Sequence, residues 1–325
     1  MTPTGCWEPT ASIEALQARA LQLKYLRSFF DRRGVLETET PVLGRHGVTD
    51  LNLDSVEANF APIIGCPARS GWLQTSPEYH MKRLLAAGSG PIYQVFRAFR
   101  SGERGTRHNP EFSLLEWYRP GFTDRELMAE VADLVCGWLE CPAPHTLSYR
   151  DALVRFAGLD PFEVSDEELE NRCERWLGEG NASGLGRDGW LDVLMSHEVE
   201  VALREQPPTF VTAYPASQAA LARVSVEGGV PVAHRFELYV NGIELCNGYW
   251  ELTDAEEQRQ RFLADNEARK GAGKPEMPVD EALLFALEAG LPDCAGVALG
   301  LDRLLMLKMG KTSIAEVVAF PFEIA

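Results

Sequence analysis

One stretch of the chain combines an arginine, an aromatic residue and an acid at a spacing that suits nucleotide chemistry. Arg100 ends an apolar run, a charged loop with two glycines follows, and Phe112 opens a second run that ends with Glu116 and Tyr118. Arginine carries a planar, permanent charge that grips phosphate oxygens in two-point geometry, and an aromatic ring can stack on a base. The spacing predicts a nucleotide-binding hairpin. For such a loop taken alone, an exposed hairpin with hydrated charges is the alternative.

A second hairpin is predicted further along the chain. Two runs with alternating apolar residues, 232–241 and 243–250, flank the dipeptide Asn241-Gly242. Asn-Gly between two such runs is the strongest short-range signal for a tight turn between antiparallel strands.

Five polar residues of this second hairpin could bind a cation or an amino acid. Asn247, Tyr249 and Glu251 are two apart and therefore face one side of a strand. Glu237 is expected across the turn from Glu244, and two facing carboxylates repel each other unless a cation such as Mg²⁺ binds them. An edge hairpin with outward polar side chains is the alternative.

The elements around these hairpins predict an α+β fold. Antiparallel hairpins argue against a doubly wound parallel sheet, and the sequence has no G-x-x-x-x-G-K-[ST] loop for phosphates. Ser76, before Pro77, is expected to cap a helix. Residues 141–187 are acidic with little strand pattern and predict a loop-rich insertion. Helices are predicted over 12–31, 123–139, 188–204 and 253–270, and strands over 72–75, 91–99 and 110–118.

Composition narrows the class of protein. The 325 residues include 31 Lys and Arg against 48 Asp and Glu, a formal net charge of −17, which disfavours stable binding of nucleic acid. Seven scattered cysteines without a C-x-x-C pair argue against a disulfide framework or a zinc site. No secretory signal and no apolar run of about 20 residues is visible. We therefore expect a cytoplasmic protein without a membrane segment.

Three segments, in order, resemble the signature motifs of the class II aminoacyl-tRNA synthetases, most closely the lysyl-tRNA synthetases. The segment from about residue 12 to about residue 41 resembles motif 1, a helix and a strand that form the dimer interface in those enzymes. The segment from about residue 91 to about residue 120 resembles motif 2. Residues of about 294–310 resemble motif 3, in which a glycine-rich strand floors the active site and a helix-borne arginine reaches ATP. The resemblance implies one catalytic domain over 1–325, with an antiparallel sheet flanked by helices, and a homodimer.

The resemblance also implies which residues bind ATP, Mg²⁺ and an amino acid. The implied catalytic cations are Arg100 and Arg303. The implied ATP contacts are Arg100, Ser101, Gly102, Glu103, His108, Asn109, Phe112, Glu244, Leu245, Gly300 and Arg303. The implied amino-acid contacts are Ser76, Pro77, Glu78, Glu116, Tyr118, Asn247, Tyr249, Glu251 and Ala298. The implied Mg²⁺ ligands are Glu237 and Glu244.

Two positions depart from the lysyl-tRNA synthetase pattern. Gly102 stands where motif 2 has a glutamate, so that either the neighbouring Glu103 replaces it, or this ATP contact is lost or made by the backbone. Ala298 stands where those enzymes have glycine. Its methyl group is expected to disfavour an α-amino group and to accept a β-amino group, unless the exchange is neutral.

Acidic residues and chain length indicate the substrates. The carboxylates of Glu78, Glu116 and Glu251 favour a ligand with more than one positive charge. Motif 1 begins near residue 12, so we expect no N-terminal anticodon-binding domain and no stable tRNA binding. This organisation resembles the elongation factor P–(R)-β-lysine ligases, stand-alone relatives of the lysyl-tRNA synthetases.

The function implied by that resemblance is ATP-dependent activation of (R)-β-lysine and its transfer to a lysine ε-amine of elongation factor P. A truncated lysyl-tRNA synthetase that charges tRNA is one alternative. A non-catalytic relative that senses an amino acid is the other.

Overall fold

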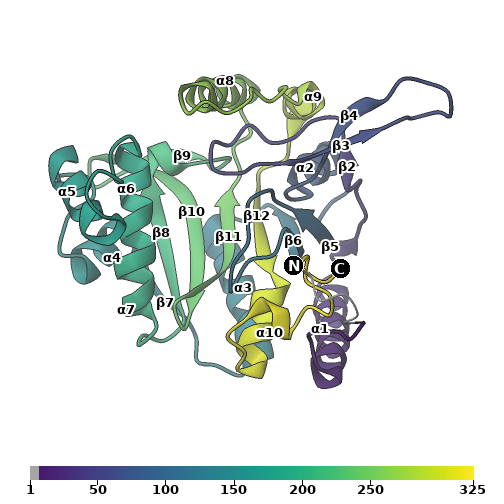
Figure 1. The fold of residues 1–325 in the computed structure, drawn as a ribbon, viewed down its shortest axis with the longest axis horizontal. Coiled ribbons are helices and arrows are strands. Elements are labelled where there is room, and N and C mark those ends of the chain that lie inside the picture. The colour runs from purple at the N-terminus through teal and green to yellow at the C-terminus, as the bar shows by residue number, and fades with distance from the viewer. Residues whose placement is uncertain (1–6) are drawn as a thin grey trace. The chain divides into compact units, whose positions relative to one another are not determined.

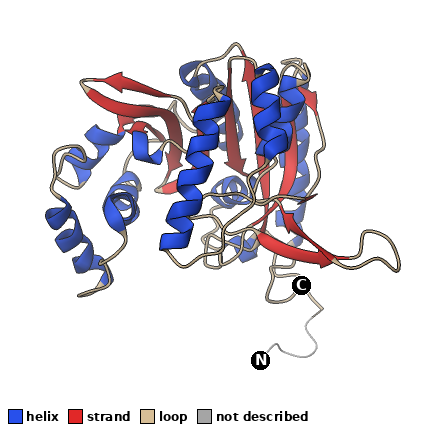
Figure 2. Cartoon of the chain, turned by 90° about the horizontal axis from the view of Figure 1, so that it is seen from above, coloured by secondary structure: helices blue, strands red, loops and turns tan. Residues whose placement is uncertain are grey.

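The computed structural model describes residues 7–325 and divides the chain into two compact units. Unit 1 contains residues 7–122 and Leu252–Ala325, and unit 2 contains Thr123–Glu251. Each unit combines helices with mostly antiparallel strands (Figures 1 and 2). The predicted α+β class, with antiparallel sheet flanked by helices, is confirmed. The single catalytic domain over 1–325 stays a prediction.

The main sheet of unit 1 contains the strands of motifs 2 and 3. Its order is β1-β5-β6-β12, with β1 parallel to β5 and the other neighbours antiparallel. The β5–β6 hairpin confirms the two strands predicted around the Arg100 loop. The strands are β1 Leu36–Glu37, β5 Ile92–Phe99, β6 Glu111–Pro120 and β12 Cys294–Gly300.

A smaller sheet of unit 1 has the order β2-β4-β3. Its hairpin of β3 and β4 forms the ribbon at the upper right of Figure 1. The strand predicted over 72–75 is confirmed only at residues 72 and 73, because β4 starts earlier, at Arg69, and ends at Leu73. The strands are β2 Leu43–Gly44, β3 Val56–Phe60 and β4 Arg69–Leu73.

Helix α1, Ile13–Asp31, confirms the predicted N-terminal helix. The Ser12 hydroxyl accepts a hydrogen bond from the Ala15 N–H at 3.2 Å, which satisfies one of the free donors at the helix start. Near the other end, Phe30 stacks on Tyr93 of β5 with ring centroids 4.3 Å apart. The helix is therefore anchored to the first strand of the motif 2 hairpin.

Helix α10, Leu301–Met309, follows β12 and is fixed by a buried acid. Asp302 accepts a hydrogen bond from the Ser113 N–H of β6 at 2.7 Å and forms an ion pair with Arg19 of α1. Gln22 of α1 donates to the first carbonyl of α10 at 3.2 Å. Motif 1 therefore holds the start of the helix that carries the motif 3 arginine.

The remaining helices of unit 1 include the one that was expected to start at Ser76. The N-cap of α2 is Pro77, so the expectation of Ser76 as N-cap is wrong by one residue. The Ser76 hydroxyl instead accepts from the Glu78 N–H at 3.2 Å, a short turn of the kind that serine favours. The helices are α2 Glu78–Ala86, α8 Ala255–Gly271, α9 Glu281–Gly290 and the 3₁₀ turn Ile314–Glu316.

The sheet of unit 2 has the order β11-β10-β8-β7, and β9 pairs with β10. The β10–β11 hairpin turns at Asn241 and Gly242, whose φ angles of 51° and 66° suit a tight turn with left-handed backbone. This hairpin was predicted. The strands are β7 His145–Ser148, β8 Thr209–Pro215, β9 Val224–Glu227, β10 Val230–Val240 and β11 Ile243–Trp250.

Unit 2 also holds the residues that were expected to form a loop-rich insertion, and that expectation is wrong. Residues 141–187 contain β7 and two helices, and helices α4 to α7 lie together beside β8 (Figure 1). Leu169 and Cys173 of α5 are fully buried, while acidic residues cover the solvent side of that helix. The prediction was based on the acidic composition of the segment, which does not reveal the helical spacing of these buried residues. The helices are α3 Asp124–Leu139, α4 Tyr149–Phe156, α5 Asp166–Leu177, α6 Gly186–Leu194, the π-helical turn Met195–Val199 and α7 Glu200–Leu203.

Two further features bear on the class of protein. Among residues 7–325, no helix is both long and apolar enough to cross a bilayer. The cysteines in this part of the chain are free thiols, at positions 66, 136, 141, 173, 246 and 294. Cys6 lies outside the described residues.

Candidate active site

The strand register of unit 1 brings one row of predicted amino-acid contacts together. Glu116 of β6 lies directly between Gln94 of β5 and Ala298 of β12. Tyr118, two residues further on the same face, lies opposite Gly296. Gly300 lies in the next row of this face. Strand β12 therefore presents only hydrogen atoms and one methyl group beside the acid, which leaves a ligand room to approach the backbone.

Glu116 and Tyr118 form a buried pair on this face. The Tyr118 hydroxyl donates to Glu116 Oε1 at 2.7 Å, and each residue is only 2% exposed. A hydrogen bond from tyrosine fixes the direction of the carboxylate. The pair can thus offer an oriented negative charge to a cationic group.

Arg100 stands at the end of β5 with three fixing contacts. Its guanidinium lies over the Phe112 ring, 4.9 Å from the centroid, and its Nε donates to the Thr75 carbonyl at 3.5 Å. Its Nη1 donates to Glu103 Oε1 at 3.4 Å. Gly102 between them has φ +80°, a backbone that favours glycine. Glu103 therefore reaches Arg100 because the chain turns at Gly102.

Arg303 of α10 meets the motif 2 loop at His108. Arg303 Nη2 donates to His108 Nε2 at 2.7 Å, so the ring accepts as a neutral imidazole with its proton assigned to Nδ1. Burial, and next the positive charge of Arg303, lower the pKa of His108 below its ordinary value of 6.5. The structure thus brings together two predicted ATP contacts that lie far apart in the sequence.

The His108–Arg303 contact predicts a pH dependence. Because the folded chain binds a proton on His108 less readily than the unfolded chain, the contact is fully present above about pH 6.5 and is lost as the pH falls through the lowered pKa. We expect the KM for ATP to rise as the pH falls below that value. In His108→Gln, whose amide stays neutral, this rise should disappear. Initial rates between about pH 5 and about pH 8 measure it, and equal slopes for both proteins would contradict the assignment.

Two predicted contacts of unit 1 already have protein partners. Asn109 donates to the Glu111 carbonyl at 2.6 Å and accepts from the Phe322 N–H at 3.1 Å, so its amide holds the motif 2 loop to the C-terminal segment. Glu78 forms an ion pair with buried Lys82 at 2.7 Å. The contribution of Glu78 to a cationic ligand is therefore reduced by Lys82.

In unit 2, a β-bulge decides which residues of the second hairpin share a face. Glu237 pairs with Asn247, whereas Glu244 pairs with Tyr239, and the register shifts between Leu238 and Tyr239. The expectation that Glu237 lies across the turn from Glu244 is wrong, because the turn itself places Glu244 opposite Tyr239, which is two residues closer to the turn than Glu237. The same bulge reverses the alternation of β11 and brings Glu244 to the side of Asn247. All the predicted polar residues of β10 and β11 therefore share one face.

Glu237 is held by three side chains. Tyr214 and Tyr239 donate to its Oε2 at 2.6 and 2.5 Å, and Arg235 donates to Oε1 at 2.5 Å. Burial, and next the Glu237 carboxylate, raise the pKa of both tyrosines, so that both hydroxyls stay protonated and donate. Glu251, at the end of the same face, is 1% exposed.

The donor set of unit 2 fits magnesium bound together with a nucleotide. Within residues 7–325, no group of three or more His, Cys, Asp or Glu side chains is arranged to hold a metal ion. Magnesium commonly takes one or two carboxylates and completes its shell with water and substrate phosphates. Glu237 and Glu244 match that pattern, and a closed metal site made only of protein side chains does not match the described residues.

The sequence reasoning missed several partners of these residues. Lys82 is four residues after Glu78, a helical spacing that predicts such an ion pair. Arg235 precedes Glu237 by two residues on the same strand face, which was also readable. Tyr214 comes from β8, and no local signal joins it to Glu237.

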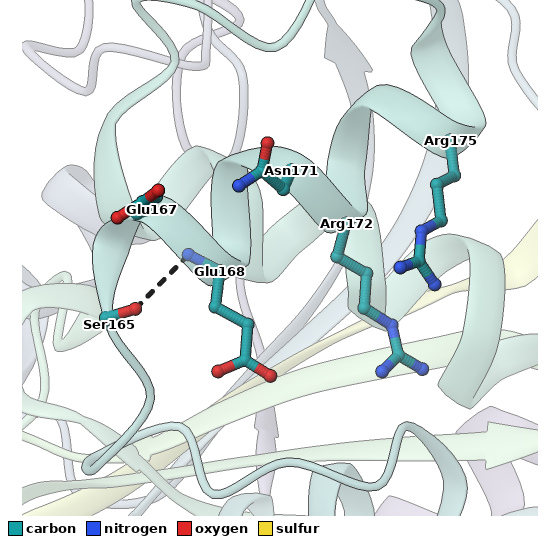
Figure 3. A pocket seen from close by; sticks show the side chains of 6 residues that line it. All are labelled: Ser165, Glu167, Glu168, Asn171, Arg172 and Arg175. Carbon is teal, nitrogen blue, oxygen red and sulfur yellow. Dashed lines mark hydrogen bonds between the residues drawn. The ribbon is translucent and has the colours of Figure 1, made fainter.

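A shallow depression of about 290 Å³ lies elsewhere, on α5 of unit 2, and Figure 3 shows its lining side chains: Ser165, Glu167, Glu168, Asn171, Arg172 and Arg175. Arg172 is bonded to Glu198 through two N–H groups, at 2.9 and 2.5 Å. Mixed charges on one helix are typical of a solvated surface. The depression contains none of the predicted site residues.

A comparison with protein families places this geometry in context. Residues 9–323 match the model of a family described as tRNA synthetases class II (D, K and N). The match covers the motif 2 hairpin, the β10–β11 hairpin and the motif 3 strand and helix.

Proposed function

Because the chain belongs to the class II tRNA synthetases of the D, K and N group, we propose that it activates (R)-β-lysine with ATP and transfers it to a lysine ε-amine of elongation factor P. The family chemistry is the ATP-dependent formation of an aminoacyl adenylate. The amino acid and the acceptor are the proposed part.

Adenylate formation requires the protein to orient the two substrates and to stabilise charge, and it requires no covalent intermediate with the protein. A carboxylate oxygen of the amino acid forms a bond to the α-phosphorus of ATP, the bond to the β-phosphate oxygen breaks, and pyrophosphate leaves. Arg100 and Arg303 would stabilise charge on the phosphate oxygens, and Phe112 would stack on the base. Mg²⁺, when bound by Glu237 and Glu244, would supply further charge stabilisation.

One observation carries the choice of β-lysine. The methyl group of Ala298 lies in the same cross-strand row as Glu116, at a position where lysyl-tRNA synthetases have glycine. If Glu116 binds the amino group nearest the reacting carboxylate, a methyl group beside it alters where that amino group fits. Glu116 and Glu251, both buried acids, favour a ligand with two positive charges.

Two alternative functions remain, one that uses the family chemistry and one that does not. A truncated lysyl-tRNA synthetase would need to hold tRNA, and the net charge of −17 disfavours that. A non-catalytic amino-acid sensor would not need both Arg100 and Arg303. Retention of both arginines favours an active enzyme.

The acceptor is tested by a transfer assay. The protein, ATP and (R)-β-lysine are incubated with elongation factor P, with a variant of that factor lacking its modified lysine, or with tRNA. We expect one added β-lysyl group on the first acceptor by mass spectrometry, and none on the other two. Charging of tRNA, with unmodified elongation factor P, would favour the truncated synthetase.

Replacing Ala298 with glycine tests the selection of β-lysine. We expect Ala298→Gly to improve activation of α-lysine relative to β-lysine, because the pocket regains space at the first carbons. A methyl group is worth about 1–3 kcal/mol of discrimination, or roughly 10–200-fold in the ratio. ATP–pyrophosphate exchange with each isomer gives that ratio. An unchanged ratio would remove Ala298 as the selector.

We also propose a homodimer through motif 1. Helix α1 leaves apolar side chains exposed in the single chain, with Ile13 61% and Leu21 60% exposed, and Leu36 of β1 is 57% exposed. Exposed apolar groups of this kind are typical of surfaces that a second chain covers.

A further inference from the structure

Arg235 of β10 is a cation to which the proposed function assigns no role, yet it is held from three directions. Its Nη2 donates to Glu237 Oε1 at 2.5 Å, and its Nη1 donates to the Gln218 carbonyl at 2.8 Å. Its guanidinium lies over the Tyr214 ring, 4.5 Å from the centroid. Its side chain is 18% exposed. These contacts fix the position of the guanidinium group.

The position of Arg235 decides which part of Glu237 is open to a ligand. Each carboxylate oxygen has two lone-pair directions. The hydroxyls of Tyr214 and Tyr239 occupy both directions of Oε2. Arg235 occupies one direction of Oε1. Counting the bonds among residues 7–325, the second direction of Oε1 is therefore the one through which Glu237 can bind a cation.

We propose that Arg235 is a positioning residue that orients Glu237 toward the Mg²⁺ of bound ATP. This inference rests on the proposed function, which assigns Mg²⁺ to Glu237 and Glu244. Partners that orient a metal-binding carboxylate typically change metal affinity by 10–100-fold when they are removed. Arg235 holds Glu237 by a charge-assisted hydrogen bond, which is both short and directional.

The test uses two replacements of Arg235 and a readout that needs no turnover. The melting temperature of each protein is measured with ATP at a fixed saturating concentration, which is expected to raise it. Mg²⁺ is then titrated to find the concentration that gives half of this rise. We expect Arg235→Met to raise that concentration by about 10–100-fold. Arg235→Lys should give a smaller rise, because an ammonium group keeps the charge but cannot make both directed bonds at once.

The matched control is Arg172→Met in the same unit. Arg172 also pairs with a shielded carboxylate, that of Glu198, whose side chain is 11% exposed, but it contacts no predicted site residue. The Arg172→Met change should lower the melting temperature of the protein. It should not change the Mg²⁺ concentration that gives half of the ATP-dependent rise in melting temperature. If Arg235→Met behaves like this control, the role of Arg235 is structural and the proposal is overturned.

The remaining outcomes are equally decisive. Should Arg235→Met fail to fold, an unchanged Mg²⁺ dependence in Arg235→Lys overturns the proposal, and a raised one supports it. The titration contains no amino acid and no acceptor protein. A failure to activate β-lysine would therefore refute the proposed substrate without affecting this test, whereas an ATP effect independent of Mg²⁺ in the unaltered protein would overturn the role of Arg235.

Discussion

Glu244→Gln is expected to lower ATP–pyrophosphate exchange by on the order of 100-fold or more, because the change removes a charge that Mg²⁺ on ATP requires. Glu244 pairs with Tyr239, and the β-bulge between β10 and β11 brings Asn247 to the same face as Glu244 and Glu237. Glutamine keeps the size and the hydrogen-bonding oxygen, so the fold should be retained. Exchange rates at saturating amino acid, measured across a range of Mg²⁺ concentrations, give the effect.

Glu227→Gln is the matched control for this change, since Glu227 is an exposed acid at the end of β9 in the same unit. It should leave exchange unchanged. A Glu244→Gln protein with the melting temperature and the exchange rate of the unaltered protein would remove Glu244 from the site.

The second large effect is expected for Arg100→Lys, with a fall in exchange of about 100–1,000-fold, the loss typical when one directed contact to developing charge is removed. Lysine keeps the positive charge but lacks the planar fork that binds two phosphate oxygens. It also loses the stacking of the guanidinium on Phe112.

Arg104→Lys separates this effect from a general disturbance of the loop by an arginine-to-lysine exchange. Arg104 lies four residues from Arg100, is 72% exposed and pairs with Glu323 at 2.5 Å. We expect it to retain near-normal exchange. Equal losses in the two variants would show that any arginine-to-lysine exchange in this loop lowers exchange, and would contradict a special role for the two-point geometry of Arg100.

The local elements of the site could be read from the sequence because short-range signals specify them. Asn241 and Gly242 adopt the left-handed backbone that a tight turn needs, and this turn was predicted from the dipeptide alone. The strand pair that carries Phe112, Glu116 and Tyr118 was likewise predicted, and the structure forms it as the β5–β6 hairpin.

Features that depend on tertiary pairing could not be read in the same way. The bulge between Leu238 and Tyr239 changes the partner of Glu237, and no local sequence signal marks the inserted position. The contact between Arg303 and His108 joins segments 195 residues apart. Its existence depends on how Asp302 and Arg19 fix α10, which is a matter of packing rather than of pattern.

Charge counting was the weakest part of the sequence reasoning. Glu78, Glu116 and Glu251 were counted as if each acted on the substrate alone, but Lys82 pairs with Glu78. A buried carboxylate generally requires such a partner. The argument for a doubly charged substrate therefore rests on Glu116 and Glu251 rather than on all the predicted acids.

The central claim, that this family chemistry is directed at β-lysine, is tested most directly by amino-acid-dependent ATP–pyrophosphate exchange with the unaltered protein. We predict exchange with (R)-β-lysine, weaker exchange with α-lysine, and none with neutral or acidic amino acids. Exchange that favours α-lysine over β-lysine, or that occurs with neither, would contradict it.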